Sequence, residues 1–446
     1  MNDDDMKGNG MTNSGFSRRG VFRAAGVAAV TAAGVAVAGE PARADAAASA
    51  AAKGRRLRAG ADVAASDGWR MFAGRKVGII TNPTGVLEDF TSIVDAMVAA
   101  GVDVTAVFGP EHGFRGTAQA GEAEETSVDP RTGVTVYDAY GATVAKLAGF
   151  YAESGVDTVV FDIRDVGVRF YTYIWTMWTA MQAAAQSGDL RFVVLDRPNP
   201  LGGRARGPVL LPEFSSGVGV LEIAQQHGMT VGELARFFNA TFMQHAGQQP
   251  LSDLQVVKAE GWRREMVGPD QADRWIPPSP NMPTPQTAVL YPGTGMVEAT
   301  DWSEGRGTTR PFELIGAPYL DYRWAEALNA KKLAGVEFRE AYFTPTFSKN
   351  ANEVCAGVQV HILDAEKVDA IAVGTHMLVE ARRLYPEFAW RGDGGRWIGL
   401  LTGSGRFQQQ LEAGASAEEI IAAWQPELKK FVQDTRPHLL YPGPRS

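Results

Sequence analysis

The fold of this chain is decided by the stretch Asp103-Val-Thr-Ala-Val-Phe-Gly-Pro-Glu-His-Gly-Phe-Arg-Gly116, in which an apolar run ends in a glycine-rich turn. The apolar half predicts a strand, and the second half predicts a tight turn beyond its end. Open α/β sheets place their chemistry at such points, because the turn brings side chains into the crevice beyond the strand. Glu111 is therefore a candidate acid or base. A turn glutamate that only caps a helix is the alternative.

Three further apolar runs also end in polar turns. They cover residues 76–80, 158–161 and 192–195, and helical patterns such as Tyr171 to Ser187 lie between the runs. Short apolar strands that alternate with helices predict an α/β fold with a parallel sheet and crossover helices on both sides.

The carboxyl ends of parallel strands lie at one edge of the sheet, so the polar turns are expected to converge there. We expect their side chains to line one crevice. They are Glu111, His112, Asp162, Arg164, Asp165, Asp196, Arg197 and Asn199.

The N-terminus predicts an export signal. Ser17-Arg-Arg-Gly-Val-Phe-Arg23 is a twin-arginine pattern, an uncharged stretch from Ala24 to Gly39 follows, and Ala42-Arg-Ala44 is a small-residue cleavage site. Residues 1–44 are therefore expected to be a signal peptide and residues 45–57 a disordered lead-in. The stretch is too short and too rich in small residues for a membrane span. We expect a periplasmic or extracellular protein.

The composition excludes several partners. The formal net charge is −8 and no block of Lys and Arg is present, which argues against nucleic acid. No G-x-G-x-x-G or phosphate-loop motif occurs, so no nucleotide cofactor is expected. The six histidines are scattered, and Arg164 between Asp162 and Asp165 would repel a cation, so we expect no metal. Cys355 is the only cysteine, which leaves no intramolecular disulfide.

A second concentration of polar residues lies between Asp301 and Arg310. Glu304 and Arg306 are next to Gly305 and Gly307, which would let the backbone approach a ligand closely. Two carboxylates from separate loops are what cleavage of a glycosidic bond needs. An exposed turn with a local ion pair is the alternative.

The segment from Pro277 to Pro285 contains too many prolines for a helix or a central strand. It predicts an extended connector near a domain boundary, with Asn281 as a polar side chain that can reach the site.

Five strings resemble the exo-β-N-acetylmuramidase (NamZ-like) family and occur in the expected order. They are residues 108–116, 161–173, 194–203, 278–284 and 303–308. The resemblance covers about Lys76 to Pro442. It implies a Rossmann-like parallel sheet with flanking helices over 58–285, and a smaller C-terminal α/β domain over 286–446 that contributes to the cleft.

The same resemblance implies an enzyme that releases N-acetylmuramic acid from non-reducing ends of peptidoglycan fragments, without nucleotide or metal. Glu111 falls on the family's proposed catalytic glutamate, and Glu304 is our hypothesis for the second carboxylate. The lactyl carboxylate of muramic acid needs a cation, for which we expect Arg306, with Arg164 or Arg115 behind it.

Two other functions fit the same residues: a non-catalytic protein that binds wall sugars, and a glycosidase for another acidic sugar. The sequence leaves open whether the reaction retains or inverts configuration. It also leaves open whether the nucleophile is a carboxylate or the substrate's own acetamido group.

Overall fold

The computed structural model describes residues 57–116, 125–268, 274–392 and 394–443. The predicted signal peptide lies outside the described residues, as does all but the last residue of the predicted lead-in. Within the described part of the chain, no helix has the length and apolar character needed to cross a membrane.

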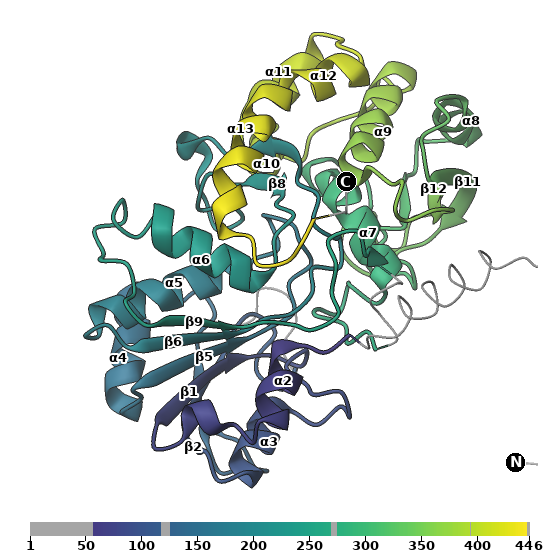
Figure 1. Ribbon diagram of the computed structural model, residues 1–446. Coiled ribbons are helices and arrows are strands. Elements are labelled where there is room, and N and C mark those ends of the chain that lie inside the picture. The colour runs from purple at the N-terminus through teal and green to yellow at the C-terminus, as the bar shows by residue number, and fades with distance from the viewer. Residues whose placement is uncertain (1–56, 117–124, 269–273, 393, 444–446) are drawn as a thin grey trace, which may run out of the picture. The chain divides into compact units, whose positions relative to one another are not determined.

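The described residues contain a seven-stranded sheet with the order β3-β4-β2-β1-β5-β6-β9 (Figure 1). All neighbours are parallel except β3 and β4. The strands are β1 (Lys76–Thr81), β2 (Asp103–Gly109), β3 (Ser127–Val128), β4 (Thr135–Asp138), β5 (Thr158–Asp162), β6 (Arg191–Leu195) and β9 (Leu254–Val257). The four strands predicted from the sequence are β1, β2, β5 and β6, and the predicted fold class is confirmed.

The order of the strands creates a switch point in the middle of the sheet. The chain passes from β1 outward to β2 and β4, and then returns to the other side of β1 with β5. Connections at the carboxyl ends of β1 and β5 therefore leave in opposite directions and open a crevice between them, which is where open α/β sheets bind their ligands.

Helices cover both faces of this sheet, which explains why its strands are apolar throughout. Ile79 on β1 packs with residues of α2 and α3, whereas its neighbour Ile80 packs with residues of α4, α5 and α6. Figure 1 shows α2 and α3 below the sheet and α5 and α6 above it. The helices are α2 (Gly60–Ser66), α3 (Ile93–Ala99), α4 (Val144–Ser154), α5 (Tyr173–Gln186) and α6 (Val231–Thr241), with the 3-10 turn η1 (Arg70–Phe72) after α2. A capping box of Thr230 and Glu233 starts α6.

The second half of the chain builds a three-stranded antiparallel sheet in the order β10-β12-β11. Its elements are α7 (Pro285–Thr294), η4 (Gly295–Ala299), β10 (Leu314–Ala317), α8 (Tyr322–Ala330), β11 (Val336–Phe343), β12 (Cys355–Ile362) and α9 (Ala370–Leu384). The segment from Pro277 to Thr284 is neither helix nor strand, as predicted, and α7 starts at the predicted boundary. The core of this half includes Val168 and Phe170 from the first half, so the boundary itself stays a prediction.

The last part of the chain returns to the first half. It consists of α10 (Arg396–Thr402), α11 (Arg406–Glu412), α12 (Ala417–Ala423), α13 (Gln425–Thr435) and η5 (Arg436–His438). The apolar pattern of residues 416–428 by itself indicates one amphipathic stretch, but two helices meet at Trp424, because Pro426 cannot continue the first of them. The α13 helix packs near β7 (Arg206–Val209), which pairs with β8 (Ala224–Gln226) after the turn η2 (Pro212–Phe214).

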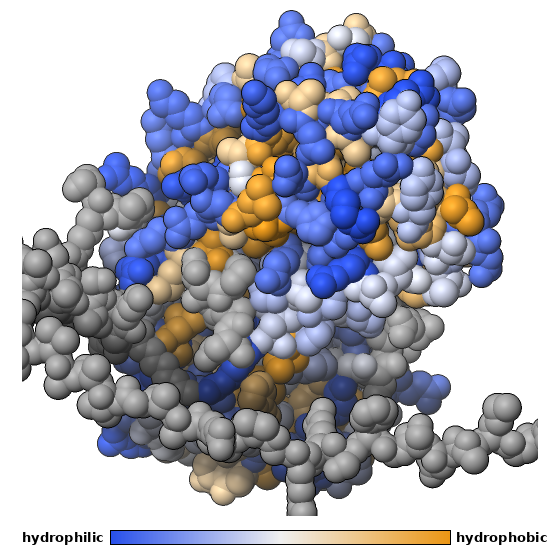
Figure 2. Space-filling model, turned by 90° about the vertical axis from the view of Figure 1, so that its right-hand side faces the viewer, coloured by the Kyte–Doolittle hydropathy of each residue, from blue (hydrophilic) through white to orange (hydrophobic). Residues whose placement is uncertain are grey.

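One face of the protein is mostly hydrophilic with small apolar areas (Figure 2).

Arg169 is fully buried and connects these parts without a counter-ion. Its Nη1 donates to the carbonyls of Pro208 (3.1 Å) and Ile223 (2.8 Å), and its Nη2 donates to the carbonyl of Leu401 (2.7 Å). No carboxylate within the described ranges forms an ion pair with it, and burial lowers the pKa of Arg169 to about 9. The loop after β5 is thereby tied to β7, to the chain before β8 and to α10.

We expect Arg169→Met to lower the free energy of unfolding by about 3 kcal/mol, because three buried carbonyls lose their donor. Urea denaturation followed by circular dichroism measures the change. Arg323→Ala is the matched control, since the Arg323 side chain is 52% exposed and should change stability by less than about 0.5 kcal/mol. Equal effects of the two substitutions would contradict the structural role of Arg169.

Candidate active site

Glu111 lies in a strained turn at the carboxyl end of β2. The Gly113 amide donates to the Pro110 carbonyl (2.9 Å), and both His112 (φ 72°) and Gly113 (φ 75°) have left-handed backbones. A positive φ is uncommon for a residue with a side chain and often marks a functional site. The Glu111 side chain is half-buried, and its Oε2 accepts a hydrogen bond from the Thr172 hydroxyl (2.9 Å). Glu111 forms no other hydrogen bond or ion pair with the described residues.

Three tyrosines form the centre of the site. Tyr171 packs edge-on against Tyr173 (5.3 Å between ring centroids) and Tyr291 (5.8 Å). Burial raises the pKa of Tyr173, and the negative charges of Glu111 and Asp165 raise it further. Burial likewise raises the pKa of Tyr291, with contributions from Glu111 and Glu304. Carboxylates from three separate segments therefore act on one aromatic cluster.

Glu304 is buried between two cations. The Nε of Arg306 lies 3.1 Å from its Oε1, and the Lys349 ammonium lies 3.0 Å from its Oε2. Arg306 also pairs with Glu298 (2.8 Å), whose pKa is raised by burial. A substrate carboxylate at Arg306 would have to share the guanidinium with these two glutamates. The assignment of Arg306 to the lactyl carboxylate stays a prediction.

The glycines around Glu304 serve the protein's own chain. A Cβ on Gly305 would lie 2.5 Å from the carbonyl of Leu314, and one on Gly307 would lie 2.7 Å from the amides of Thr346 and Phe347. We expected these glycines to admit a ligand to the backbone. The structure differs, because two neighbouring segments already occupy that space.

Asp165 follows β5 and is buried, with its two carboxylate oxygens in different surroundings. Oδ2 accepts from the Gly167 amide (2.6 Å) and lies 3.0 Å from Nε2 of His227. Oδ1 is buried without a hydrogen bond. The fold therefore keeps one oxygen of this carboxylate unpaired beside the tyrosine cluster.

The sequence matches the family models of exo-β-N-acetylmuramidase NamZ over both halves, the N-terminal model at residues 77–286 and the C-terminal model at residues 289–441. This chain belongs to the NamZ family. The peptidoglycan β-N-acetylmuramidase NamZ of Bacillus subtilis (strain 168) is 43% identical over 394 residues, which cover 87% of this chain and 92% of the relative. The predicted family resemblance is confirmed.

Two solved structures are similar to this member of the NamZ family. Both are DUF1343 family proteins from Bacteroides fragilis NCTC 9343. One has a TM-score of 0.78 and 33% identity, and the other has a TM-score of 0.69 and 28% identity. Each comparison covers 87% of this chain and 99% of the solved chain.

Four of the polar residues expected in the crevice have partners inside the protein. Asp162 and Arg197 form a buried ion pair through both carboxylate oxygens, with Arg197 Nη2 2.8 Å from Asp162 Oδ2. Asn199 donates to the carbonyl of Met229 (2.8 Å). Asp196 accepts from the hydroxyls of Thr230 (2.8 Å) and Tyr441 (2.6 Å) and from the amide of Gly232 (2.8 Å). These groups hold the sheet edge and the C-terminus together.

The remaining predicted residues lie around the site in different roles. Arg115 pairs with Asp129 (2.9 Å) and Asp95 (3.0 Å). Arg164 lies over the ring of Trp275 (5.7 Å to the centroid). Asn281 is buried in the connector before α7, and His112 is buried in the Glu111 turn. Their proposed contacts with substrate stay predictions.

Sequence reasoning missed several residues of the site. Asn82 follows β1, and the rule that found Glu111 could have found it, because the same sheet edge was involved. Tyr291 on α7, Lys349 and His227 come from segments without a strand-end signal. No pattern in the sequence indicated that they would meet the β5 loop.

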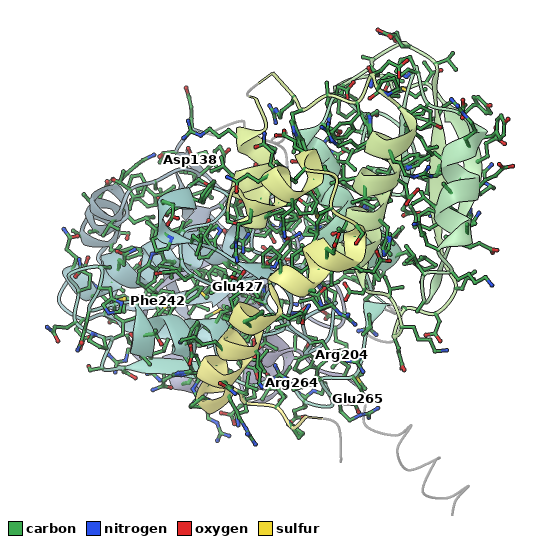
Figure 3. The ribbon with its side chains drawn as sticks, turned by 90° about the horizontal axis from the view of Figure 1, so that it is seen from above. Asp138, Arg204, Phe242, Arg264, Glu265 and Glu427 are labelled. Atoms are coloured by element: carbon green, nitrogen blue, oxygen red, sulfur yellow. The ribbon has the colours of Figure 1, made fainter. Side chains whose placement is uncertain are left out.

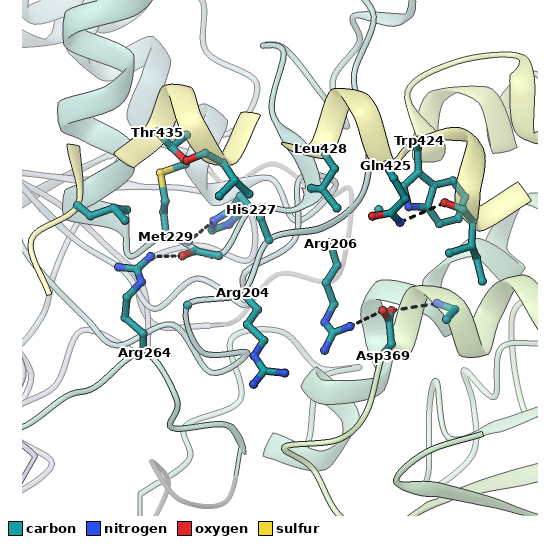
Figure 4. A pocket seen from close by; sticks show the side chains of 18 residues that line it. Arg204, Arg206, His227, Met229, Arg264, Asp369, Trp424, Gln425, Leu428 and Thr435 are labelled. Carbon is teal, nitrogen blue, oxygen red and sulfur yellow. Dashed lines mark hydrogen bonds and ion pairs between the residues drawn. The ribbon is translucent and has the colours of Figure 1, made fainter. Parts of the chain in front are cut away.

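A cavity of about 460 Å³ opens beside His227 (Figure 4). Arg206 and Arg264 in its wall pair with Asp369 and Glu233. Arg204 is exposed; its carbonyl accepts from Gln226 Nε2 (2.9 Å), and its guanidinium has no hydrogen bond or ion pair with the described residues. Figure 3 shows Arg204 and Arg264 near the end of α13. Apolar side chains of α12 and α13 form the opposite wall, and Tyr171, Tyr173 and Tyr291 are not among the lining residues.

Asp196 gives a pH-dependent test of its structural role. Burial raises its pKa from 3.8 to about 6, against the hydrogen bonds that lower it. In this window the folded state keeps a proton that the unfolded state has lost, so ionisation opposes folding and stability falls as pH rises from about 4 to 6.

We expect Asp196→Asn to remove this dependence. The difference in free energy of unfolding between the variant and the parent protein should shift in favour of the variant by up to roughly 3 kcal/mol as the pH rises from 4 to 7. Urea denaturation at several pH values measures the difference. A stability difference that is constant over this range would show that Asp196 titrates normally.

Proposed function

We propose that this protein is an exo-acting β-N-acetylmuramidase that releases N-acetylmuramic acid from non-reducing ends of peptidoglycan fragments, with Glu111 as general acid. Membership of the NamZ family and the Bacillus subtilis relative support the reaction. The observation that carries the assignment of Glu111 is its placement: a half-buried carboxylate, fixed by Thr172, at the carboxyl end of the sheet beside three tyrosines.

The geometry of Glu111 suits proton donation. The Thr172 hydroxyl fixes Oε2, which leaves Oε1 as the oxygen that can carry a proton toward the glycosidic oxygen. The ring of Tyr171, which is half-buried, supplies a flat apolar surface of the kind that packs against a sugar ring, and the buried Tyr291 ring supports it from behind. One positioned acid and a surface for the sugar are two of the elements of glycoside hydrolysis.

Glu304 is our candidate for the second carboxylate. Arg306 and Lys349 pair with its two carboxylate oxygens, and this pairing weakens Glu304 as a nucleophile. Its contribution is then electrostatic, because an anion near the anomeric carbon stabilises positive charge in the transition state. The nucleophile must then be another group.

We also propose that the protein is exported by the twin-arginine route and acts outside the cytoplasm, where peptidoglycan fragments occur. The twin-arginine pattern and the single buried cysteine support this, because the fold needs no disulfide. Replacing Arg18 and Arg19 together by Lys should retain the protein in the cytoplasm, as measured by cell fractionation. Unchanged export of that double variant would contradict the route.

We expect Glu111→Gln to reduce kcat by about 10²- to 10⁴-fold, because the amide cannot donate the proton to the leaving oxygen. Release of N-acetylmuramic acid from a muramic acid-terminated disaccharide, followed by chromatography, measures the rate. Glu337→Gln is the matched control, since this glutamate is exposed on β11.

The outcomes separate the possible functions. Binding of the disaccharide without any release by the parent protein would indicate a wall-sugar binding protein. Cleavage of a glucuronide but not of the muramide would indicate a glycosidase for another acidic sugar. Turnover of Glu111→Gln at nearly the parent rate would show that another residue is the acid.

A further inference from the structure

The tautomer of His227 explains why Oδ1 of Asp165 has no hydrogen bond. The Met229 amide donates to Nδ1 of His227 (3.2 Å), so Nδ1 carries no proton. In the neutral ring Nε2 therefore carries the proton and donates it to Oδ2 of Asp165 (3.0 Å). With the Gly167 amide as second donor, Oδ2 is satisfied and Oδ1 is not.

A buried carboxylate oxygen without a donor is costly and needs an explanation. The other buried carboxylates of this region are paired: Asp162 by Arg197, and Glu304 by Arg306 and Lys349. Glu304 Oε2 has no hydrogen bond either, but the Lys349 ammonium lies 3.0 Å from it, whereas no cation among the described residues pairs with Oδ1 of Asp165. Asp165 lies just beyond β5 at the switch point of the sheet. A ligand that donates an N–H would complete it.

A second unpaired polar group lies beside Asp165. The Tyr171 hydroxyl is buried without a hydrogen bond that meets distance and angle criteria, and the Ser279 side chain is near enough to lower its pKa. Burial raises the pKa of Tyr171, and the charge of Asp165 adds to this effect; both residues belong to the loop after β5. The Nδ2 of Asn82, near Tyr173, is a third buried group without a partner. Unmet acceptors and donors therefore gather at one place.

We infer that Asp165 and Tyr171 hold the 2-acetamido group of the sugar and that its carbonyl oxygen is the nucleophile. An acetamido group has one N–H donor and one carbonyl acceptor, which match Oδ1 of Asp165 and the hydroxyl of Tyr171. The inference rests on the proposed function and supplies the nucleophile that Glu304, held by two cations, does not.

The reaction then has two balanced steps. In the first, the acetamido oxygen forms a bond to C1, and the bond from C1 to the glycosidic oxygen breaks as that oxygen takes the proton of Glu111. The product is an oxazolinium ion, whose N–H⁺ is paired with the Asp165 carboxylate. In the second, water attacks C1 and gives a proton to Glu111, and the electron pair of the C1–O bond returns to the acetamido oxygen. Two inversions at C1 retain the β configuration.

A series of aryl β-muramides tests this inference. The substrates carry acetyl, fluoroacetyl, difluoroacetyl or trifluoroacetyl on the nitrogen, and fluorine makes the carbonyl oxygen a poorer nucleophile. We expect kcat/KM to fall by at least about tenfold along the series. Proton NMR should show the β anomer of the released sugar first.

Variants connect this dependence to the two residues. Asp165→Asn should lower kcat/KM for the acetyl substrate by about 100-fold and Tyr171→Phe by about tenfold. Asp165→Asn should also reduce the decrease of kcat/KM with the number of fluorine atoms. A substitution that only destabilised the fold would lower all four rates and leave that decrease unchanged. Arg204→Ala, in the separate cavity, is the control and should behave as the parent.

A rate that does not change along the fluorine series, or α anomer as first product, would overturn the inference while leaving the muramidase activity intact. Failure of the parent protein to cleave the acetyl substrate would instead overturn the proposed function. If Asp165→Asn does not fold, as judged by circular dichroism, the parent series and Tyr171→Phe still decide the question.

Discussion

The buried guanidinium of Arg169 is the interaction on which the rest of the site depends. It holds three carbonyls from separate parts of the chain, and its own backbone is fixed as well: its amide donates to the Gln225 carbonyl (2.8 Å), and its carbonyl accepts from Trp175 Nε1 (2.8 Å). A buried charge without a counter-ion is costly. The Nε of Arg169 has no hydrogen bond among the described residues, so the bonds of Nη1 and Nη2 and the two backbone bonds carry the anchoring. The loop after β5 is thereby held in one place.

That loop carries the groups that define the site. Asp165 precedes Arg169 by four residues, and Tyr171 and Thr172 follow it by two and three residues. Because the loop is fixed, Thr172 can hold Glu111 from the neighbouring strand end, and Tyr171 can meet Tyr291 from α7. Catalytic groups need such support, since small displacements of a positioned acid cost much of its effect. The site is therefore built by both halves of the chain.

The strands and the convergence of their turns could be predicted, because apolar runs followed by glycine or proline are a strong local signal. The roles of the polar residues could not. Asp162 and Asp196 follow strands just as Asp165 does, yet the first meets Arg197 and the second meets Tyr441, which is more than 200 residues away in the chain. Which turn carboxylate keeps an unpaired oxygen depends on long-range partners, and these have no signature in the sequence. The break at Trp424 was missed because the pattern of apolar residues continues through it.

The most direct measurement is a crystal structure of the Glu111→Gln variant with a muramic acid-terminated disaccharide. We expect the sugar to lie against Tyr171, with its glycosidic oxygen within hydrogen-bonding distance of the side chain at position 111 and its acetamido N–H on Asp165. Binding of the disaccharide in the cavity between Arg204 and Trp424, away from position 111, would contradict it.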